Sequence, residues 1–402
     1  MHTRRGGFRT TSSRLWSLHL TRHEIGAVPP KEKRLTRPIR SLVALGAAAL
    51  LSLGGVSTVA TVSASASPAS ASTRAHLVES PAQAALERAV TPSECARTLL
   101  DTYVDGLFNG MTDEQFAFLV AHQDTLLNVP TYDALFFGTP DDPDYALESH
   151  AAPIKHTFRD LRRFWNIESA DIQLMAMHGD VLLDADRIAR TLTAMVRTGQ
   201  IDTLTPAEIR TEAATVADFM REQGDFYDNP LWTLNAFAFS GEGDPDPVFA
   251  ALPDKLIVGD GIIDAYDAIG LGDVGVRVIM AHEFGHHVQY ELGVFNTGPT
   301  DPAEATRRTE LMADAMAAYY GTSKKGLALN KKRVADALLT FYTVGDCQFD
   351  SPGHHGTPLQ RERAADWGAD LAAAAKPRSY VLPAATFVEL FDQALPQIIS
   401  GN

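Results

Sequence analysis

The residues that decide the fold are Asp273–Leu292, DVGVRVIMAHEFGHHVQYEL, and the Gly293 that follows them. Apolar residues recur in this stretch with a helical period and the glycine ends the pattern, so the sequence predicts an amphipathic helix. His282 and His286 are four positions apart. Both imidazoles are therefore expected on one helical face, where they can bind the same metal ion.

The residues around these two histidines indicate zinc. Zinc binds imidazole nitrogen readily, and its catalytic sites keep one coordination position open for water. Glu283 follows the first histidine and completes a His-Glu-x-x-His motif. A carboxylate at this position can take a proton from zinc-bound water. We therefore predict one catalytic Zn²⁺ ion, with His282 and His286 as ligands and Glu283 as the general base.

A catalytic zinc ion needs a third protein ligand. The metzincin continuation of the motif requires glycine and histidine where this chain has Gln289 and Leu292, so that class is excluded. Glu310 and Asp314 lie four positions apart on the next predicted helix, and so they share a face. We expect Glu310 to be the third ligand and Asp314 to orient a ligand histidine through its other ring nitrogen.

Three further residues bear on how these two helices pack. Ala313 and Ala317 are small, so the second helix can approach the first closely. His287 points about 100° away from His286 on an ideal helix. We therefore expect His287 to have a packing or surface role and not to be a ligand.

These motifs resemble the gluzincin metallopeptidases. The His282–His286 motif together with Glu310-x-x-Ala313-Asp314 is similar to the HtpX-like and CAAX-prenyl-endopeptidase group. Ala281–Gln289, AHEFGHHVQ, is very similar to the HE-x-GHHVQ helix of the putative neutral zinc metallopeptidase family. The resemblance covers roughly residues 230–365. It implies a zincin-like core and hydrolysis of a peptide bond.

A short segment before the helix extends the resemblance. Asn235, Ala236, Phe237 and Ala238 resemble the NAFA edge strand of the prenyl-endopeptidase group. In those families this strand pairs with the backbone of the substrate, a mode of binding that suits an exposed edge. The resemblance implies the same role for these four residues.

A segment after the two helices also resembles the family. The sequence HGTPLQR, from His355 to Arg361, is similar to a His-(Pro or Gly)-x-x-x-x-Arg element whose histidine and arginine lie near the zinc. The resemblance implies that His355 and Arg361 polarise the scissile carbonyl or hold the active site. His354 is an alternative to His355, and Tyr319 and Tyr320 are further candidate donors to the oxyanion. The simpler interpretation of the segment is the basic start of a helix with no catalytic role.

The charge of the chain divides into two parts. The chain has 402 residues and a net charge of −15. Residues 1–71 hold ten Lys/Arg and two acidic residues, whereas the rest hold 25 Lys/Arg and 48 acidic residues. The part of the chain after residue 71 is too acidic to bind phosphate groups well, so we exclude nucleic acid as a partner. A basic head on an acidic body is typical of a targeting segment joined to a mature protein.

The basic segment has the layout of a secretory signal peptide. Residues 41–60 are apolar and uncharged, with basic residues before them and small residues after them. Two Ala-Ser-Ala sequences, at 64–66 and 69–71, suit cleavage. We predict a signal peptide and a Ser/Ala-rich processing region in residues 1–71, and a secreted protein. One alternative is an uncleaved membrane anchor with the rest of the protein outside the cell, and only in this case do we expect membrane contact. The other alternative is a cytoplasmic protein.

The rest of the chain divides into two predicted regions. Residues 72–222 contain repeated helix capping signals, at Thr91, Thr112 and Thr205, and predict a helical N-terminal region. Residues 223–402 are expected to form the zincin-like peptidase core with C-terminal helices. Within this core, two short β-branched runs flank Gly259, Asp260 and Gly261, where we expect two strands, or a strand and a short turn. The fold class is therefore α+β, dominated by helices, with a small sheet before the active-site helix.

The chain has two cysteines, Cys95 and Cys347. In an exported protein we expect them to form one disulfide between the N-terminal helical part and the C-terminal part. The alternative is two separate buried thiols.

Three functional interpretations stay open at this level. The first is a secreted zinc endopeptidase acting on a peptide or protein substrate. The second is a non-catalytic extracellular metal-binding or interaction protein on a metallopeptidase scaffold. The third is a zinc hydrolase of a non-peptide amide, which a covered edge strand would favour.

Overall fold

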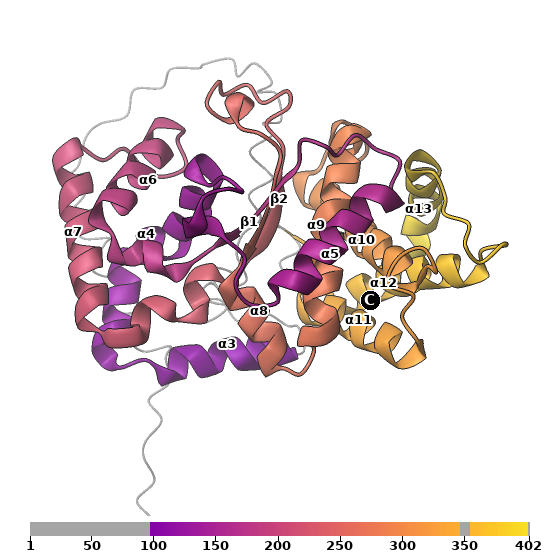
Figure 1. Cartoon of the computed structure of the whole chain (residues 1–402), viewed down its shortest axis with the longest axis horizontal. Helices are drawn as coiled ribbons and strands as arrows, with labels where there is room; N and C mark the ends of the chain where they lie inside the picture. The colour runs from indigo at the N-terminus through magenta and orange to yellow at the C-terminus, as the bar shows by residue number, and fades with distance from the viewer. Residues whose placement is uncertain (1–96, 346–353, 401–402) are drawn as a thin grey trace, which may run out of the picture. The chain divides into compact units, whose positions relative to one another are not determined.

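The computed structural model describes residues 97–345 and 354–400 of the chain (Figure 1). Most of these residues are helical, and three short strands form one sheet, which confirms the predicted helix-dominated α+β class. The predicted signal peptide, Cys95 and Cys347 lie outside the described residues, so these stay predictions. Among the helices described, none is long and apolar enough to cross a membrane.

The sheet joins both predicted regions of the body. Its strands are β1 (Gln173–Met177), β2 (Ala236–Phe239) and β3 (Lys255–Gly259), in the order β1-β3-β2. β1 pairs with β3 in parallel and β2 pairs with β3 antiparallel, so β3 is central. β1 comes from the region predicted to be helical. Its sequence, QLMAM, has no β-branched residue and gives no strand signal.

The second β-branched run after Gly259 is not a strand. It belongs to helix α8 (Asp260–Ala268), which starts directly where β3 ends. The alternative of a strand and a short turn is also wrong here, because a helix takes the place of the turn. Backbone packing explains the small residues: a Cβ placed on Gly261 would lie 1.9 Å from the carbonyl oxygen of Pro230.

Five of the described helices come before strands β2 and β3, and three of them begin at a capping box. The five are α3 (Leu99–Gly110), α4 (Asp113–Phe137), α5 (Ala151–Phe164), α6 (Ala185–Arg197) and α7 (Pro206–Glu222). Thr98, Thr112 and Thr205 each form a capping box, in which the threonine and the residue three positions later satisfy each other's backbone N–H groups. The capping signals read from the sequence at Thr112 and Thr205 are confirmed, and the one at Thr91 lies outside the described residues.

The helices that follow α8 are α9 (Gly272–Glu291), α10 (Pro302–Thr322), α11 (Lys331–Thr343), α12 (Pro358–Ala374) and α13 (Ala384–Ile399). Short 3₁₀ turns complete the described part: η2 (Pro143–Tyr145), η3 (Gly179–Leu183), η4 (Gly224–Asp228), η5 (Pro230–Thr233), η6 (Phe249–Ala251) and η7 (Val294–Asn296).

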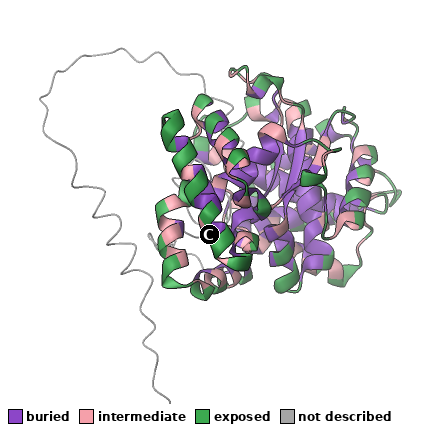
Figure 2. Cartoon of the chain, turned by 60° about the vertical axis from the view of Figure 1, so that its left-hand side comes forward, coloured by how far each residue is buried: buried purple, intermediate pink, exposed green. Residues whose placement is uncertain are grey.

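The helix that carries the His-Glu-x-x-His motif, α9, is buried on nearly all sides. It contacts α5, α8, α10, α11 and the strands β2 and β3. Figure 2 shows that buried residues gather in the interior of the described part of the chain. Nearly all residues from Gly272 to Gln289 are buried, with Asp273 and Arg277 as the exceptions. The helix itself is confirmed, but its prediction as amphipathic is wrong, because neighbouring elements cover the faces that the pattern left open.

Small residues let α9 and α10 approach closely. A Cβ placed on Gly285 would lie 3.2 Å from the Cα of Ala313, tighter than ordinary van der Waals contact. The close approach expected at Ala313 is confirmed. This contact places the fourth residue of the metal motif directly against the helix that carries Glu310.

A buried lysine anchors the central strand to α4. The ammonium group of Lys255 donates hydrogen bonds to the carbonyl oxygens of Leu135 and Gly138, both at 2.7 Å, and to that of Ala134 at 3.3 Å. These carbonyls belong to the last turn of α4 and the residue after it, where a helix leaves carbonyls without intrahelical partners. The carbonyl of Ala134 also accepts from the N–H of Gly138. Burial lowers the pKa of Lys255 to about 8.

Candidate active site

Helices α9 and α10 bring three predicted metal ligands together. The Nε2 atoms of His282 and His286 lie 3.2 Å apart. Each lies 3.3 Å from a different carboxylate oxygen of Glu310. All three side chains are buried, and their candidate ligand atoms lie within 4.8 Å of one another. Within the described residues, this is the one group of at least three His, Cys, Asp or Glu side chains with such geometry.

Asp314 holds the other side of the first histidine. Its Oδ1 lies 2.8 Å from Nδ1 of His282. Arg361 in turn donates two hydrogen bonds to Asp314, from Nε and from Nη2, both at 2.7 Å. Because a carboxylate held by arginine accepts hydrogen bonds, Nδ1 of His282 carries a proton and Nε2 faces Glu310. The geometry matches the orienting role expected of Asp314.

A residue that the sequence analysis did not select lies beside the second histidine. Nδ1 of His286 lies 3.0 Å from Oε1 of Gln289. The amide nitrogen of Gln289 donates to the carbonyl oxygen of Thr309 at 2.8 Å. Gln289 is three positions after His286, a spacing that brings side chains together on a helix. This spacing is the one sequence feature that could have pointed to Gln289.

Glu283 lies between the histidines and the sheet. Its carboxylate is buried and accepts a hydrogen bond from the backbone N–H of Ala238 on β2. Its Oε2 atom is buried and has no hydrogen-bond partner among the described residues. Burial raises the pKa of Glu283, and the charge of Glu310 adds to this effect. An unpartnered buried carboxylate oxygen is what a general base for a bound water needs.

The charges of the site are strongly coupled. Burial opposes the charged form of His282, but hydrogen bonds to Asp314 and Glu310 raise its pKa to about 10. Burial also opposes ionisation of Glu310, yet the charges of His286 and His355 hold the pKa of this carboxyl well below its usual range. The buried site therefore stabilises a cation between its carboxylates, either a proton or a metal ion.

The predicted substrate strand lies at the edge of the sheet beside Glu283. The backbone N–H of Gly259 donates to the carbonyl oxygen of Asn235. In an antiparallel ladder, Phe237 then also faces β3, and the backbone groups of Ala236 and Ala238 face away from it. No described strand pairs with that outer edge. Nonetheless the residues from Asn235 to Ala238 are covered, with exposed fractions of 6%, 8%, 0% and 3%.

The candidate oxyanion donors differ in their burial and in the groups that they contact. Arg361 is buried, bonded to Asp314, and 3.6 Å from Glu310. His355 is partly exposed, and its charge acts on Glu310. Tyr319 and Tyr320 pack against the ring of Phe164, and the Tyr319 hydroxyl accepts a hydrogen bond from the backbone of Leu382.

Among these four, His355 is the partly exposed side chain whose charge acts on Glu310. His354 is buried. His287 is also buried, and its Nε2 lies 3.1 Å from the carbonyl oxygen of Lys255, so it packs against the sheet as expected.

An aromatic pair borders the site and was not anticipated. The rings of Tyr290 and Phe295 lie 4.7 Å apart, and the ring of Phe295 lies 6.2 Å from that of His286. Burial, and the charges of Glu283 and Glu310, raise the pKa of the Tyr290 phenol well above its usual value. Tyr290 therefore lies within electrostatic reach of the site, one helical turn after His286.

The donor set fits a zinc ion. Two imidazole nitrogens and one carboxylate oxygen are ligands of the catalytic zinc type, which leaves one position open. Both histidines have their Nδ1 atoms bonded elsewhere and their Nε2 atoms facing Glu310. The buried unpartnered oxygen of Glu283 lies in the same site. The described residues thus supply three candidate ligands and a candidate base.

Comparison with known proteins supports this interpretation. No solved structure matches the chain. Uncharacterized proteins of Mycobacterium tuberculosis and Mycobacterium bovis are 34% identical to it over 115 residues. The match covers 23% of this chain and 39% of each relative, so the chain spans well under half of their length. Residues 266–358 match the family described as putative neutral zinc metallopeptidase. This match and the buried His282–His286–Glu310 cluster together support placing the chain with a zinc metallopeptidase family.

Proposed function

We propose that the chain is a secreted zinc-dependent endopeptidase. The observation that carries this proposal is the buried cluster of His282, His286 and Glu310 with the unpartnered carboxylate oxygen of Glu283 beside it. The family match at residues 266–358 makes peptides or proteins the expected substrate class. The more specific resemblance to the HtpX-like and prenyl-endopeptidase group stays a prediction.

The chemistry divides between the metal and the chain. When bound by His282, His286 and Glu310, a zinc ion acts as a Lewis acid and lowers the pKa of water toward about 7. Glu283 takes the proton from the attacking water and then delivers it to the leaving amine. Its burial supports this role, because a raised pKa brings a carboxylate closer to the operating pH. We assign His355 the role of donor to the developing oxyanion, because its charge acts on the ligand carboxylate of Glu310.

Strand β2 is the proposed binding edge for a peptide. The outward N–H and C=O of Ala236 and the outward C=O of Ala238 are the groups that an added strand would pair with. The N–H of Ala238 already contacts Glu283, so this edge adjoins the proposed base. A peptide bound there would lie with its backbone next to the catalytic carboxylate.

The burial of β2 favours a second candidate function. Because the four residues from Asn235 to Ala238 are 8% exposed or less, an extended peptide needs some movement of the covering chain before it can pair. A small amide does not. We therefore keep hydrolysis of a small non-peptide amide as the alternative within the same zinc chemistry.

Export is proposed on sequence grounds alone. The basic segment before residues 41–60 and the two Ala-Ser-Ala sequences after them support a cleaved signal. N-terminal sequencing of the protein recovered from the culture medium tests this proposal. A mature N-terminus near residues 66–72 is expected, whereas recovery of the whole chain in the membrane fraction would favour the anchor.

The peptidase activity is tested on the purified chain loaded with one equivalent of zinc. We expect cleavage of an unfolded protein and of blocked peptides, with loss of activity in Glu283→Gln and after chelation. Cleavage that survives both treatments rejects the proposal. Zinc binding without any hydrolysis favours the non-catalytic interpretation, and hydrolysis of small amides alone favours the second candidate.

A further inference from the structure

We propose that Gln289 is a positioning residue for the metal site, which fixes the ring of His286 and the spacing between His286 and Glu310. This inference rests on the proposed zinc site and adds a residue to it. Gln289 is fully buried on α9, and its side chain contacts both helices that carry ligands.

The backbone of α10 determines which way the amide points. The side-chain nitrogen of Gln289 lies 2.8 Å from the carbonyl oxygen of Thr309, which can only accept a hydrogen bond. The NH₂ group therefore faces Thr309, and the amide oxygen faces His286. The reverse orientation would place two acceptors against each other in a buried site where water does not replace the lost contact.

The amide orientation then determines the tautomer of His286. Oε1 of Gln289 accepts only, so Nδ1 of His286, at 3.0 Å, carries the proton. The lone pair of the neutral ring is thereby left on Nε2, the atom that faces Glu310 at 3.3 Å. The carbonyl of Thr309 thus selects the metal-binding tautomer of His286 through a single side chain.

The same side chain connects the two ligands across the helix interface. Thr309 directly precedes Glu310 in the chain. Gln289 is therefore bonded to one ligand residue on α9 and to the backbone next to another on α10. A shift of either helix along the other would break one of these bonds, so the amide fixes the distance between the donor atoms.

The two histidines are held by different chemistry. His282 is bonded to the carboxylate of Asp314, which Arg361 holds in place, whereas His286 is bonded to a neutral amide. The buried site already contains the carboxyl groups of Glu283, Glu310 and Asp314. A neutral partner for His286 orients the ring without adding a fourth buried carboxyl group.

The test measures metal binding and does not require turnover. In Gln289→Met a side chain of similar size makes neither hydrogen bond, and in Gln289→Asn a shorter amide does not reach both partners. We expect the zinc dissociation constant, measured by competition with a chelator, to rise about 10–100-fold in both variants. We also expect the visible absorption spectrum of the Co²⁺-loaded protein to change, because the geometry of one ligand changes.

Gln200→Met is the matched control. Gln200 accepts a hydrogen bond from the Tyr132 hydroxyl at 2.8 Å and donates one to the carbonyl oxygen of Thr198 at 3.0 Å. It therefore has the same pattern of contacts as Gln289 in a part of the chain that does not contact the ligands. Its substitution is expected to lower the melting temperature and to leave the zinc dissociation constant and the Co²⁺ spectrum unchanged.

Two results would overturn the inference. One is that Gln289→Met keeps the zinc affinity and the Co²⁺ spectrum of the parent protein. If Gln289→Met does not fold, the same result in Gln289→Asn overturns the inference. The other is an equal loss of zinc affinity in Gln200→Met. A parent protein that binds zinc and hydrolyses nothing rejects the peptidase proposal alone, because every readout here is of binding.

Discussion

Arg361 and Asp314 form a bidentate pair in which Nε and Nη2 of the arginine each lie 2.7 Å from a carboxylate oxygen. Arg361 lies in the first turn of α12, well after α9 and α10 in the sequence. Asp314 uses the same carboxylate to hold His282 at 2.8 Å. The pair therefore links α12 to the candidate metal site on α9 through α10.

The first prediction concerns this pair. Asp314→Asn removes the charge that balances the buried guanidinium of Arg361, so the free energy of unfolding is expected to fall by about 3–5 kcal/mol. Zinc affinity is expected to fall about 10–100-fold, because His282 loses its charged partner. Chemical denaturation of the metal-free protein and chelator competition measure the two effects.

The chain offers a control with the same pairing geometry. Asp392 accepts from Nε and Nη2 of Arg308 at 2.7 and 2.8 Å, and its side chain is 40% exposed. Asp392→Asn is expected to keep the parental zinc affinity. Equal zinc affinity in Asp314→Asn and Asp392→Asn would contradict the role given to Asp314.

The second prediction separates the ligand carboxylate from the base. Glu310 and Glu283 are both buried in one site, but the oxygens of Glu310 are those that lie 3.3 Å from the two histidine nitrogens. Glu310→Ala is expected to lose most bound zinc, whereas Glu283→Gln is expected to keep close to one equivalent. Metal content by mass spectrometry after gel filtration checks both, and undiminished zinc in Glu310→Ala rules out Glu310 as a ligand.

The helices that carry the site were predictable because their signals are local. A four-residue spacing places His282 and His286 together, and the same spacing pairs Glu310 with Asp314. Polar caps mark where helices begin, as Asp301 does for α10 and Thr357 for α12, and Gly293 follows the end of α9. These features depend on neighbours in the sequence alone, and the structure follows them in α9, α10 and α12.

Contacts between elements that are far apart in the sequence were not predictable. The bond from Gln289 to the backbone of Thr309 requires the relative position of α9 and α10, which periodicity does not report. The same holds for the cover over β2, and for β1, whose apolar residues fit a buried helix as well as a strand. A pattern tells which face of an element is apolar, but not which element covers it.

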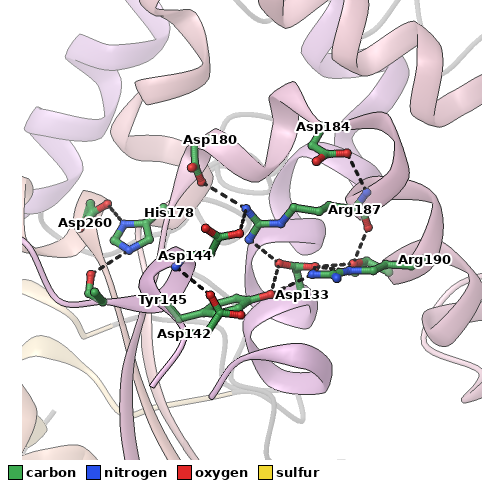
Figure 3. Close-up of polar contacts among 12 residues, drawn as sticks. Asp133, Asp142, Asp144, Tyr145, His178, Asp180, Asp184, Arg187, Arg190 and Asp260 are labelled. Carbon is green, nitrogen blue, oxygen red and sulfur yellow. Dashed lines mark hydrogen bonds and ion pairs between the residues drawn. The ribbon is translucent and has the colours of Figure 1, made fainter. Parts of the chain in front are cut away.

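The third prediction concerns a polar cluster away from the metal site, drawn in Figure 3. Asp133 on α4 is fully buried and accepts hydrogen bonds from Arg187, Arg190, Tyr145 and Thr191 at 2.7 to 3.2 Å. Removing the carboxylate leaves the guanidinium groups without their buried partner. Asp133→Ala is therefore expected to lower the free energy of unfolding by about 3–5 kcal/mol.

An exposed pair provides the comparison. Asp218 and Arg221 lie 2.7 Å apart on the surface of α7, with half or more of each side chain exposed. Asp218→Ala is expected to change the free energy of unfolding by about 0–1 kcal/mol. Urea denaturation of both variants measures the difference, and similar losses would show that Asp133 does not act as the centre of a buried network.

The last prediction is a pH dependence of stability at His178. Its Nδ1 lies 2.5 Å from Asp260 and its Nε2 lies 3.0 Å from the carbonyl oxygen of Ala146 (Figure 3). Both ring nitrogens face acceptors, so the bound form is the imidazolium. Burial opposes this charge, but the hydrogen bond and charge of Asp260, with Asp180 and Glu148 nearby, raise the pKa of His178.

A histidine whose pKa is higher in the folded state than in the unfolded state stabilises the fold most at low pH. The contribution of His178 is therefore complete below about pH 6.5, the unfolded value, and it is lost as the pH rises through the higher folded value. In His178→Gln the free energy of unfolding should fall relative to the parent at low pH, and the gap should close as the pH rises. A gap that stays constant or widens with pH would show that His178 is neutral in the folded protein.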